Sequence, residues 1–189
     1  MCGFIGFTGI IDQREDVIRK MADRIVHRGP DSDGYHVSGE SPFDSITLGF
    51  RRLSIIDLAD GSQPMYNEDG GMVIVYNGEV YNFMELREEL IKAGHKFKTR
   101  CDSEVIIHGY EEWGTSLASK LRGMFAFVIW DTKTSTLYGA RDPFGIKPFY
   151  YYNAPSGNIL FGSEIKSFLD HPEFKAEVNE RALRPYLTF

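Results

Sequence analysis

The second residue of the chain carries two groups suited to nucleophilic chemistry. Once Met1 is removed, Cys2 bears both a thiol and a free α-amine. The thiol is a soft nucleophile, and the amine is a base whose usual pKa of about 7.7–8.0 lies near neutrality. Cys2 therefore supplies a nucleophile and its general base in one residue, the logic of N-terminal nucleophile amidases. If Met1 stays attached, the amine is acylated and the chain is an inactive precursor.

The dipeptide Asn77-Gly78 follows the apolar run MVIVY (72–76) and has two interpretations. The Asn amide and the Gly backbone N–H could form a two-donor oxyanion hole, in which one donor is worth roughly 3–4 kcal/mol. Asn-Gly is equally a common signal for a short β-turn. Taken alone, the dipeptide favours the turn.

Two charged residues could hold the ends of an amino acid. Arg52, in RRLSIID (51–57), has a planar guanidinium that matches a carboxylate, although a surface salt bridge is the simpler interpretation. Asp102 could accept a hydrogen bond from an ammonium group, or it could cap a helix. Together with Cys2 and Asn77, these groups would fit glutamine or asparagine, which carry an α-carboxylate, an α-ammonium and a side-chain amide.

Two further motifs have a structural interpretation. HRGPD (27–31) predicts a rigid turn with a buried polar pair; His27 could act as a base, but the N-terminal amine makes this unnecessary. RDPFGIKP (141–148) looks at first like a phosphate loop. It lacks the spacing of a P-loop or of GxGxxG, which favours a structural connection.

The hydrophobic pattern predicts mixed helices and strands. Residues 2–11 read as a buried strand with three glycines, and a helix capped by Asp12 and Glu15 follows. Asn82 and Glu85 would cap a second helix, and Asp102 or Ser103 a third. Asn179 would cap a last one. Strands are expected near residues 34–37, 46–50, 72–76, 124–131, 136–142, 148–152 and 159–164.

This order departs from the strict βαβα alternation of a parallel sheet. Two antiparallel sheets with helices outside them, an α+β architecture, fit better. The chain of 189 residues predicts one domain. The final LRPYLTF is apolar and nothing follows to cover it; taken alone, such an end favours a local cap over a missing domain.

Composition narrows the class of protein. The net charge of −6 argues against nucleic acid or a membrane surface as the main partner. Two cysteines without Cys-His spacing indicate neither a disulfide framework nor a zinc site, so we expect no metal in this chain. The start lacks the basic region of a signal peptide, and no apolar run reaches the roughly 18 residues of a membrane span. A cytoplasmic location would suit a free thiol.

Taken in order, MCGFIGF, HRGPDSDG, RRLSIIDL, QPM, VYNGEVYN, CDSEVI, GMFAFVIWD, ARDPFGIKPFYY and SEIKS are similar to a known family. The chain resembles the N-terminal glutaminase domain of glutamine-dependent asparagine synthetases, a class II glutamine amidotransferase with the N-terminal nucleophile hydrolase fold. Sister families typically have a GH-x-R motif near the position of FRRLSIID. The resemblance implies a four-layer αββα sandwich.

The resemblance also implies roles for individual residues. Cys2 would be the nucleophile, and Asn77 with Gly78 the oxyanion hole. Arg52 would bind the substrate α-carboxylate, beside a pocket wall that consists of Leu53, Ser54, Ile55 and Ile56. Glu79 and Asp102 would accept hydrogen bonds from the α-ammonium.

The family's second domain, which binds ATP through an SGG-type loop and adenylates aspartate, has no counterpart here. The resemblance therefore implies that residues from about 170 to 189 begin the connection to such a domain. We therefore expect hydrolysis of L-glutamine to glutamate and ammonia, with no cofactor in this chain; ATP and Mg²⁺ belong to the synthetase domain, the expected partner. A homodimer is a further expected assembly. Two alternatives stay open: a non-catalytic glutamine-binding or interaction module with the same fold, and an amidase for another amide.

Overall fold

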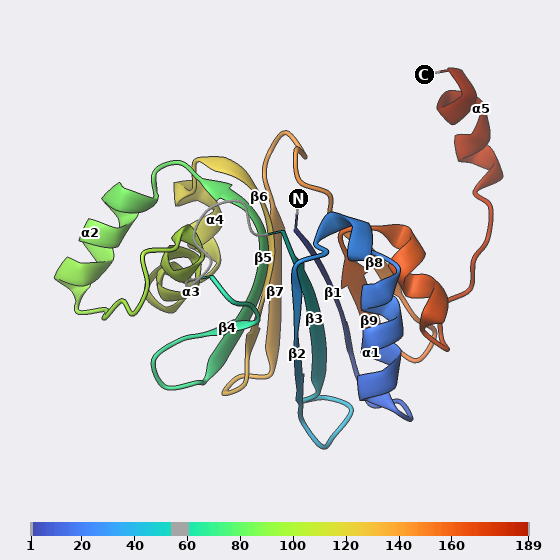
Figure 1. Ribbon diagram of the computed structural model, residues 1–189, viewed down its shortest axis with the longest axis horizontal. Helices are drawn as coiled ribbons and strands as arrows, with labels where there is room; N and C mark the ends of the chain where they lie inside the picture. Colours follow the sequence, from blue (N-terminus) through green and yellow to red (C-terminus); the bar gives the residue numbers. More distant parts are fainter. Residues whose placement is uncertain (1, 54–60, 189) are drawn as a thin grey trace.

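Two antiparallel sheets lie face to face in the computed structural model, which describes residues 2–53 and 61–188 (Figure 1). The first sheet has the order β2-β3-β1-β9-β8 and the second the order β4-β5-β6-β7. The strands of the first sheet are β1 (Gly3–Thr8), β2 (Ser32–Ser38), β3 (Ile46–Arg52), β8 (Tyr150–Asn153) and β9 (Ile159–Gly162). Those of the second are β4 (Met65–Tyr66), β5 (Met72–Val80), β6 (Gly123–Asp131) and β7 (Thr136–Arg141).

Helices cover the outer face of each sheet, so the fold has four layers (Figure 1). Over the first sheet lie α1 (Arg14–Asp23), η1 (Val26–Arg28) and η3 (Ile165–Asp170). Over the second lie α2 (Phe83–Ala93), α3 (Asp102–Trp113), η2 (Gly114–Ser116) and α4 (Leu117–Lys120). The expected α+β sandwich of two antiparallel sheets with helices outside is confirmed.

Alternation along the strands divides the core into three clusters. Phe4 faces the other sheet and packs in the central cluster with Phe50 and Val75, whereas its neighbour Ile5 faces outward and packs under α1. The third cluster lies between the second sheet and the pair α2 and α3. Successive residues of a strand face opposite sides of the sheet, so the parity of a residue, its odd or even position along the strand, decides whether its side chain reaches the space between the sheets.

The predicted helix caps were wrong in three of four cases. The helix α1 begins at Arg14, after Gln13 in a left-handed conformation (φ 54°), with no side-chain cap. Asn82 does precede α2, but its amide binds the backbone of Lys120 and Arg122 instead. A tertiary partner thus replaced the local cap.

The cap expected at Asp102 or Ser103 is also absent, because Cys101 occupies the N-cap position of α3 and makes no side-chain cap bond. Only the last cap is confirmed. Asn179 precedes α5 (Glu180–Thr188), and its Oδ1 accepts a hydrogen bond from the Arg181 N–H at 3.2 Å.

The last helix stands away from the sandwich (Figure 1). None of its described side chains is buried, and Leu183, Tyr186 and Leu187 are exposed. Among the described residues, no helix combines the length and the apolar character that crossing a bilayer requires.

Candidate active site

Cys2 lies directly before β1, the strand that begins beside the label of the N-terminus (Figure 1). Its thiol is partly exposed and packs against the central cluster. The backbone of Leu53 holds the sulfur, because the Leu53 N–H donates to Sγ at 3.4 Å and the Leu53 carbonyl lies 3.8 Å away. The nucleophile is therefore fixed from the end of the neighbouring strand.

A charged pair holds the backbone of Cys2. Arg28 Nε donates to the Cys2 carbonyl oxygen at 3.0 Å, and its Nη1 donates to Glu164 Oε1 at 3.1 Å. Burial opposes ionisation of Glu164, but hydrogen bonds from His27, Arg28 and Lys166 lower its pKa overall. A Cβ on Gly3 would lie 3.0 Å from Arg28 Cδ, so the glycine after the nucleophile leaves room for this arginine.

Strand parity brings three of the predicted site residues to the same side. Cys2 shares the parity of Phe4, Arg52 that of Phe50, and Asn77 that of Val75, and all three apolar residues face the space between the sheets. In the register of the first sheet Gly3 pairs with Arg51, so Cys2 and Arg52 lie at the same end of β1 and β3. Across the space, β1 packs against β5.

The side-chain amide of Asn77 is buried, and its NH2 group lacks a hydrogen-bond partner among the described residues. The residue is only 3% exposed, and within the described part of the chain its Nδ2 makes no hydrogen bond. A buried polar group without a partner costs about 1–3 kcal/mol, so such a group needs an explanation. The lack of a partner would be explained if the Asn77 NH2 group donates a hydrogen bond to a substrate oxygen.

Gly78 offers a second donor beside it. Phe125, its partner on β6, exchanges hydrogen bonds with Asp142 through both backbone groups, so the Gly78–Phe125 pair is the non-hydrogen-bonded type. The Gly78 N–H therefore points away from β6. Two other residues of β5 also point their backbone groups away from β6. The N–H and carbonyl of Tyr76 bind the Gln63 side chain, and the Val80 N–H donates to the Asp102 carboxylate.

The described residues provide no recorded partner for the Gly78 N–H. The turn interpretation of Asn77-Gly78 is wrong, because β5 runs through both residues to Val80. A Cβ on Gly78 would lie 2.4 Å from the Met124 carbonyl oxygen and 2.7 Å from the Tyr76 ring. Close packing against β6 thus requires this glycine.

Asp102 points from the first turn of α3 toward the end of β5. Its Oδ2 accepts hydrogen bonds from the Tyr76 hydroxyl at 2.7 Å and the Val80 N–H at 2.9 Å. Burial, reinforced by the Asp102 carboxylate, raises the pKa of Tyr76 well above its usual value, so the phenol stays a neutral donor. Within the described residues Oδ1 has no recorded hydrogen bond and can accept one from an ammonium.

The two arginines of RRLSIID have separate environments. Arg51 forms ion pairs with Asp23 of α1 and Asp33 of β2 and donates to the Ala22 carbonyl. Arg52 faces the space between the sheets.

Arg52 also lies near the start of α3. Arg52 Nη2 and Cys101 Sγ both lie within 4 Å of the point that a Cβ on Gly61 would take. Arg52 and Asp102 therefore approach one region from different elements. Leu53 contributes its backbone to Cys2, whereas Ser54, Ile55 and Ile56, the rest of the predicted pocket wall, lie outside the described residues.

Of the predicted site residues, Glu79 has the least structural support. It shares the parity of Asn77 but is exposed, and no hydrogen bond is recorded for its side chain among the described residues. Its charge contributes to the raised pKa of Tyr76, which places it near the same end of β5.

Of the remaining motifs, HRGPD lacks the buried polar pair that was expected, because His27 is exposed and its Nε2 lies 2.8 Å from Glu164 Oε1. RDPFGIKP has the structural role that was predicted for it. In RDPFGIKP, the Asp142 carboxylate accepts hydrogen bonds from four backbone N–H groups, those of Phe125, Phe144, Ile146 and Lys147. These bonds lower the pKa of Asp142 although burial opposes the shift.

Sequence reasoning missed four supporting residues: Arg28, Gln63, Tyr76 and Glu164. Each lies inside a motif that was recognised as a string, namely HRGPDSDG, QPM, VYNGEVYN and SEIKS. Gln63 binds both backbone groups of Tyr76, at 2.6 and 3.0 Å, and continues the sheet edge before β4 begins. Only the register could reveal this contact.

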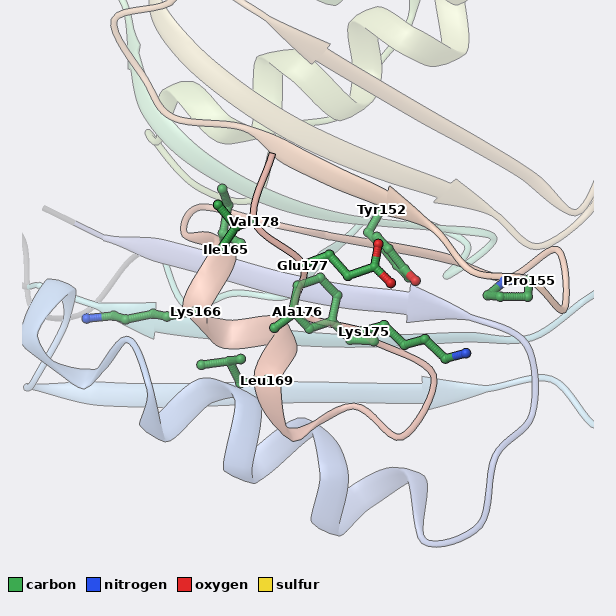
Figure 2. Close-up of a pocket in the computed structure, with 10 residues that line it drawn as sticks. Tyr152, Pro155, Ile165, Lys166, Leu169, Lys175, Ala176, Glu177 and Val178 are labelled. Atoms are coloured by element: carbon green, nitrogen blue, oxygen red, sulfur yellow. The ribbon is translucent and has the colours of Figure 1, made fainter. Parts of the chain in front are cut away.

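A groove of about 750 Å³ lies elsewhere, over the first sheet (Figure 2). Tyr152, Ile165, Leu169 and the segment that leads to α5 line it. Its described lining includes none of the predicted site residues.

Comparisons with known proteins identify the family of the chain. Residues 1–189 match the family described as "Glutamine amidotransferase domain". The chain is 46% identical over 195 residues to "Asparagine synthetase [glutamine-hydrolyzing] 1" of Bacillus subtilis (strain 168), a match that covers 100% of this chain and 30% of that protein. It is 40% identical over 176 residues to "Asparagine synthetase [glutamine-hydrolyzing] 3" of Arabidopsis thaliana, with 92% and 29% covered.

The chain thus spans about 30% of the length of these relatives. Among solved structures, a glutamine phosphoribosylpyrophosphate amidotransferase from B. subtilis matches with a TM-score of 0.70 at 20% identity, covering 88% of this chain and 43% of that one. This likeness shows the fold alone.

Proposed function

The chain belongs to the glutamine amidotransferase domain family, and we propose that it hydrolyses L-glutamine to glutamate and ammonia through a thioester on Cys2. The observation that carries the proposal is the buried, unpartnered amide of Asn77, which faces the same space between the sheets as the Cys2 thiol. A nucleophile opposite unused donors is the arrangement that acyl transfer needs.

In the first half of the reaction, the Cys2 α-amine takes the thiol proton and Sγ attacks the side-chain amide carbon of glutamine. The carbonyl electrons move onto the oxygen, which the Asn77 amide and the Gly78 N–H stabilise. When the C–N bond breaks, the ammonium form of the amine returns the proton to the leaving nitrogen. Ammonia departs and the γ-glutamyl thioester remains.

In the second half, a water molecule loses a proton to the same amine and attacks the thioester carbon. The same two donors stabilise the second oxyanion. Collapse breaks the C–S bond, glutamate leaves, and the proton returns to the thiolate. The amine therefore ends each cycle as it began.

Arg52 and Asp102 give the site its selectivity for a free amino acid. We assign the substrate α-carboxylate to the Arg52 guanidinium, whose fork can donate two parallel hydrogen bonds. The α-ammonium would donate to Asp102 Oδ1, with the exposed Glu79 adding negative charge nearby. Leu53 and residues 54–56 would form the wall beside the carboxylate.

We further propose that the ammonia serves the amidation of aspartate in a synthetase domain, as the names of the relatives suggest. ATP and Mg²⁺ would act in that domain, and this half needs no cofactor. Residues from about 170 onward would form the connection. The exposed apolar side chains of α5 and the groove beneath the preceding segment support this assignment (Figure 2).

A second copy of the chain is the alternative cover for α5, and measurement of the oligomeric state distinguishes the two. A reducing cytoplasm would keep Cys2 in its thiol form. The glutaminase proposal depends neither on what covers α5 nor on the cellular location.

The experiment is an ammonia-release assay on protein whose N-terminus mass spectrometry shows to be free Cys2. Cys2→Ser should lose nearly all turnover and still bind glutamine, because a hydroxyl is far harder to deprotonate than a thiol and the thiol does not hold the substrate ends. Full turnover by Cys2→Ser would refute the mechanism. Glutamine binding without turnover in the processed parent protein would instead support the non-catalytic module.

A further inference from the structure

A second cluster of polar side chains lies at the outer side of the second sheet. Three segments contribute to it: Glu68 from the turn between β4 and β5, His95 from the loop after α2, and His108 with Glu111 from α3. His108 and Glu111 are three residues apart and so share one face of the helix. The glutaminase mechanism uses none of these four residues.

One ligand atom from each residue points into a common space. The four atoms lie within 4.8 Å of one another. His108 Nδ1 is 2.9 Å from Glu111 Oε2 and 3.5 Å from Glu68 Oε2, and His95 Nδ1 is 3.8 Å from Glu111 Oε2. Four ligands at the usual 2.0–2.1 Å from a tetrahedral Zn²⁺ would be about 3.3 Å apart, so small adjustments would seat the ion.

The outer atoms of both carboxylates are held by the protein. Glu111 Oε1 accepts a hydrogen bond from Asn67 Nδ2 at 2.7 Å, and Glu68 Oε1 accepts one from the Lys96 N–H at 3.0 Å. Each carboxylate therefore turns its remaining oxygen inward. Outer contacts of this kind orient the ligands of protein metal sites.

The outer nitrogens of both imidazoles face carboxylates. His95 Nε2 lies 3.3 Å from Glu112 Oε2, and His108 Nε2 lies 3.6 Å from Glu104 Oε1. The carboxylate at His95 Nε2 favours the tautomer with the proton there, which leaves the lone pair of His95 Nδ1 directed into the cluster. The 3.6 Å separation at His108 Nε2 is too long for a hydrogen bond, whereas His108 Nδ1 lies within hydrogen-bond distance of Glu111 Oε2. Three acceptors thus converge with His108 Nδ1, which becomes the fourth ligand atom when His108 carries its proton on Nε2, and no lysine or arginine of the described chain forms an ion pair with Glu68 or Glu111.

We propose that Glu68, His95, His108 and Glu111 bind a single Zn²⁺ ion. Two imidazole nitrogens and two carboxylate oxygens are a ligand set that suits zinc. The ion would join the β4–β5 turn, the loop after α2 and the middle of α3. Because the protein supplies all four ligands, the site would be structural.

The main competitor of the metal is a proton on His108. Burial opposes protonation of this almost fully buried residue, but the carboxylates of Glu111, Glu68 and Glu104 raise its pKa overall. A proton satisfies the pair of His108 and Glu111. It gives no donor to His95 Nδ1, whereas a metal ion engages all four atoms.

The test measures Zn²⁺ binding in a Cys2→Ala background, since the N-terminal thiol and amine could themselves bind zinc. Chelator-treated protein is titrated with Zn²⁺ against a chromophoric chelator, and Tm is measured with and without the metal. We expect one Zn²⁺ per chain and a higher Tm with zinc, because a ligand that binds the folded state stabilises it.

Two variants at the more exposed ligands, Glu68→Gln and His95→Gln, keep the buried His108 and should fold. Each should weaken Zn²⁺ binding by more than the 10–100-fold that outer contacts typically contribute, and should abolish the zinc-dependent rise in Tm. The matched control is Glu112→Gln, which alters a neighbour of His95 and leaves all four ligands in place; it should lose at most that smaller factor. Absence of binding by the parent, or binding by both ligand variants equal to the parent's, would overturn the proposal.

Discussion

The hydroxyl of Tyr76 donates a 2.7 Å hydrogen bond to the carboxylate of Asp102, and so joins β5 to the first turn of α3. The Val80 N–H occupies the same oxygen. Among the described residues, the other oxygen has no recorded hydrogen bond. An aspartate that sequence alone would assign to a helix cap is thus held at the end of β5, where we propose that it binds the substrate ammonium.

Tyr76→Phe should therefore raise KM for glutamine more than it lowers kcat. The lost hydrogen bond is worth about 0.5–1.5 kcal/mol, which corresponds to roughly a two- to tenfold rise in KM. Steady-state ammonia release measures both constants. Tyr138→Phe is the control, because its hydroxyl binds the Thr115 carbonyl away from Asp102. An equal rise in KM for both variants would contradict the assignment.

Asn77→Leu should separate catalysis from stability. Loss of one oxyanion donor should lower kcat by roughly 10²- to 10³-fold. Because Asn77 Nδ2 has no hydrogen-bond partner among the residues that the structure describes, replacement of Asn77 by an apolar side chain of similar size should leave Tm unchanged or raise it. A normal kcat, or a large loss of Tm, would show that the amide has a structural role instead.

Arg52→Lys should weaken glutamine binding although the charge is retained, because an ammonium cannot make the paired hydrogen bonds of a guanidinium. We expect KM to rise about tenfold or more, in line with one lost charge-assisted hydrogen bond of about 1.5–3 kcal/mol. Arg51→Lys is a matched control on the opposite face of β3, where Asp23 and Asp33 bind it. A larger effect on KM at Arg51 than at Arg52 would reverse the assignment.

Arg28→Lys should lower kcat with little change in KM, because Arg28 positions the backbone of Cys2 and makes no proposed contact with substrate. A displaced nucleophile costs up to about 10²-fold in rate. Arg24→Lys provides the comparison, since Arg24 forms an exposed pair with Asp170 at 2.7 Å. Equal kcat values in the two variants would exclude a positioning role for Arg28.

The architecture could be predicted from sequence because local pattern and fold agree. The apolar run at 72–76 and the dense strands after residue 123 belong to the second sheet, as expected. The chemistry of Cys2, Arg52, Asn77 and Asp102 suggested that they form one site, and the family resemblance implied a role for each. Strand parity now gives a physical reason for the first three, and the role of each remains a prediction.

Contacts between distant segments could not be predicted. Asn77-Gly78 has the composition of a turn, but nine residues of β6 pair with β5 and keep it extended. Asn82 and Asp102 have the composition of helix caps, but each finds a partner far away in sequence. The cluster of Glu68, His95, His108 and Glu111 has no sequence spacing typical of a zinc site, since three separate segments supply its ligands.

The central claim, that the Cys2 thiol attacks a bound glutamine, is tested most directly by labelling with a glutamine analogue that carries an electrophilic ketone in place of the side-chain amide. The account predicts one adduct per chain, located by peptide mass spectrometry on the N-terminal cysteine, formed in step with the loss of ammonia release and slowed by free glutamine. Cys101, the other cysteine, serves as the internal control and should stay unlabelled. Loss of activity with the label on Cys101 alone, or complete turnover by protein fully labelled at Cys2, would contradict the account.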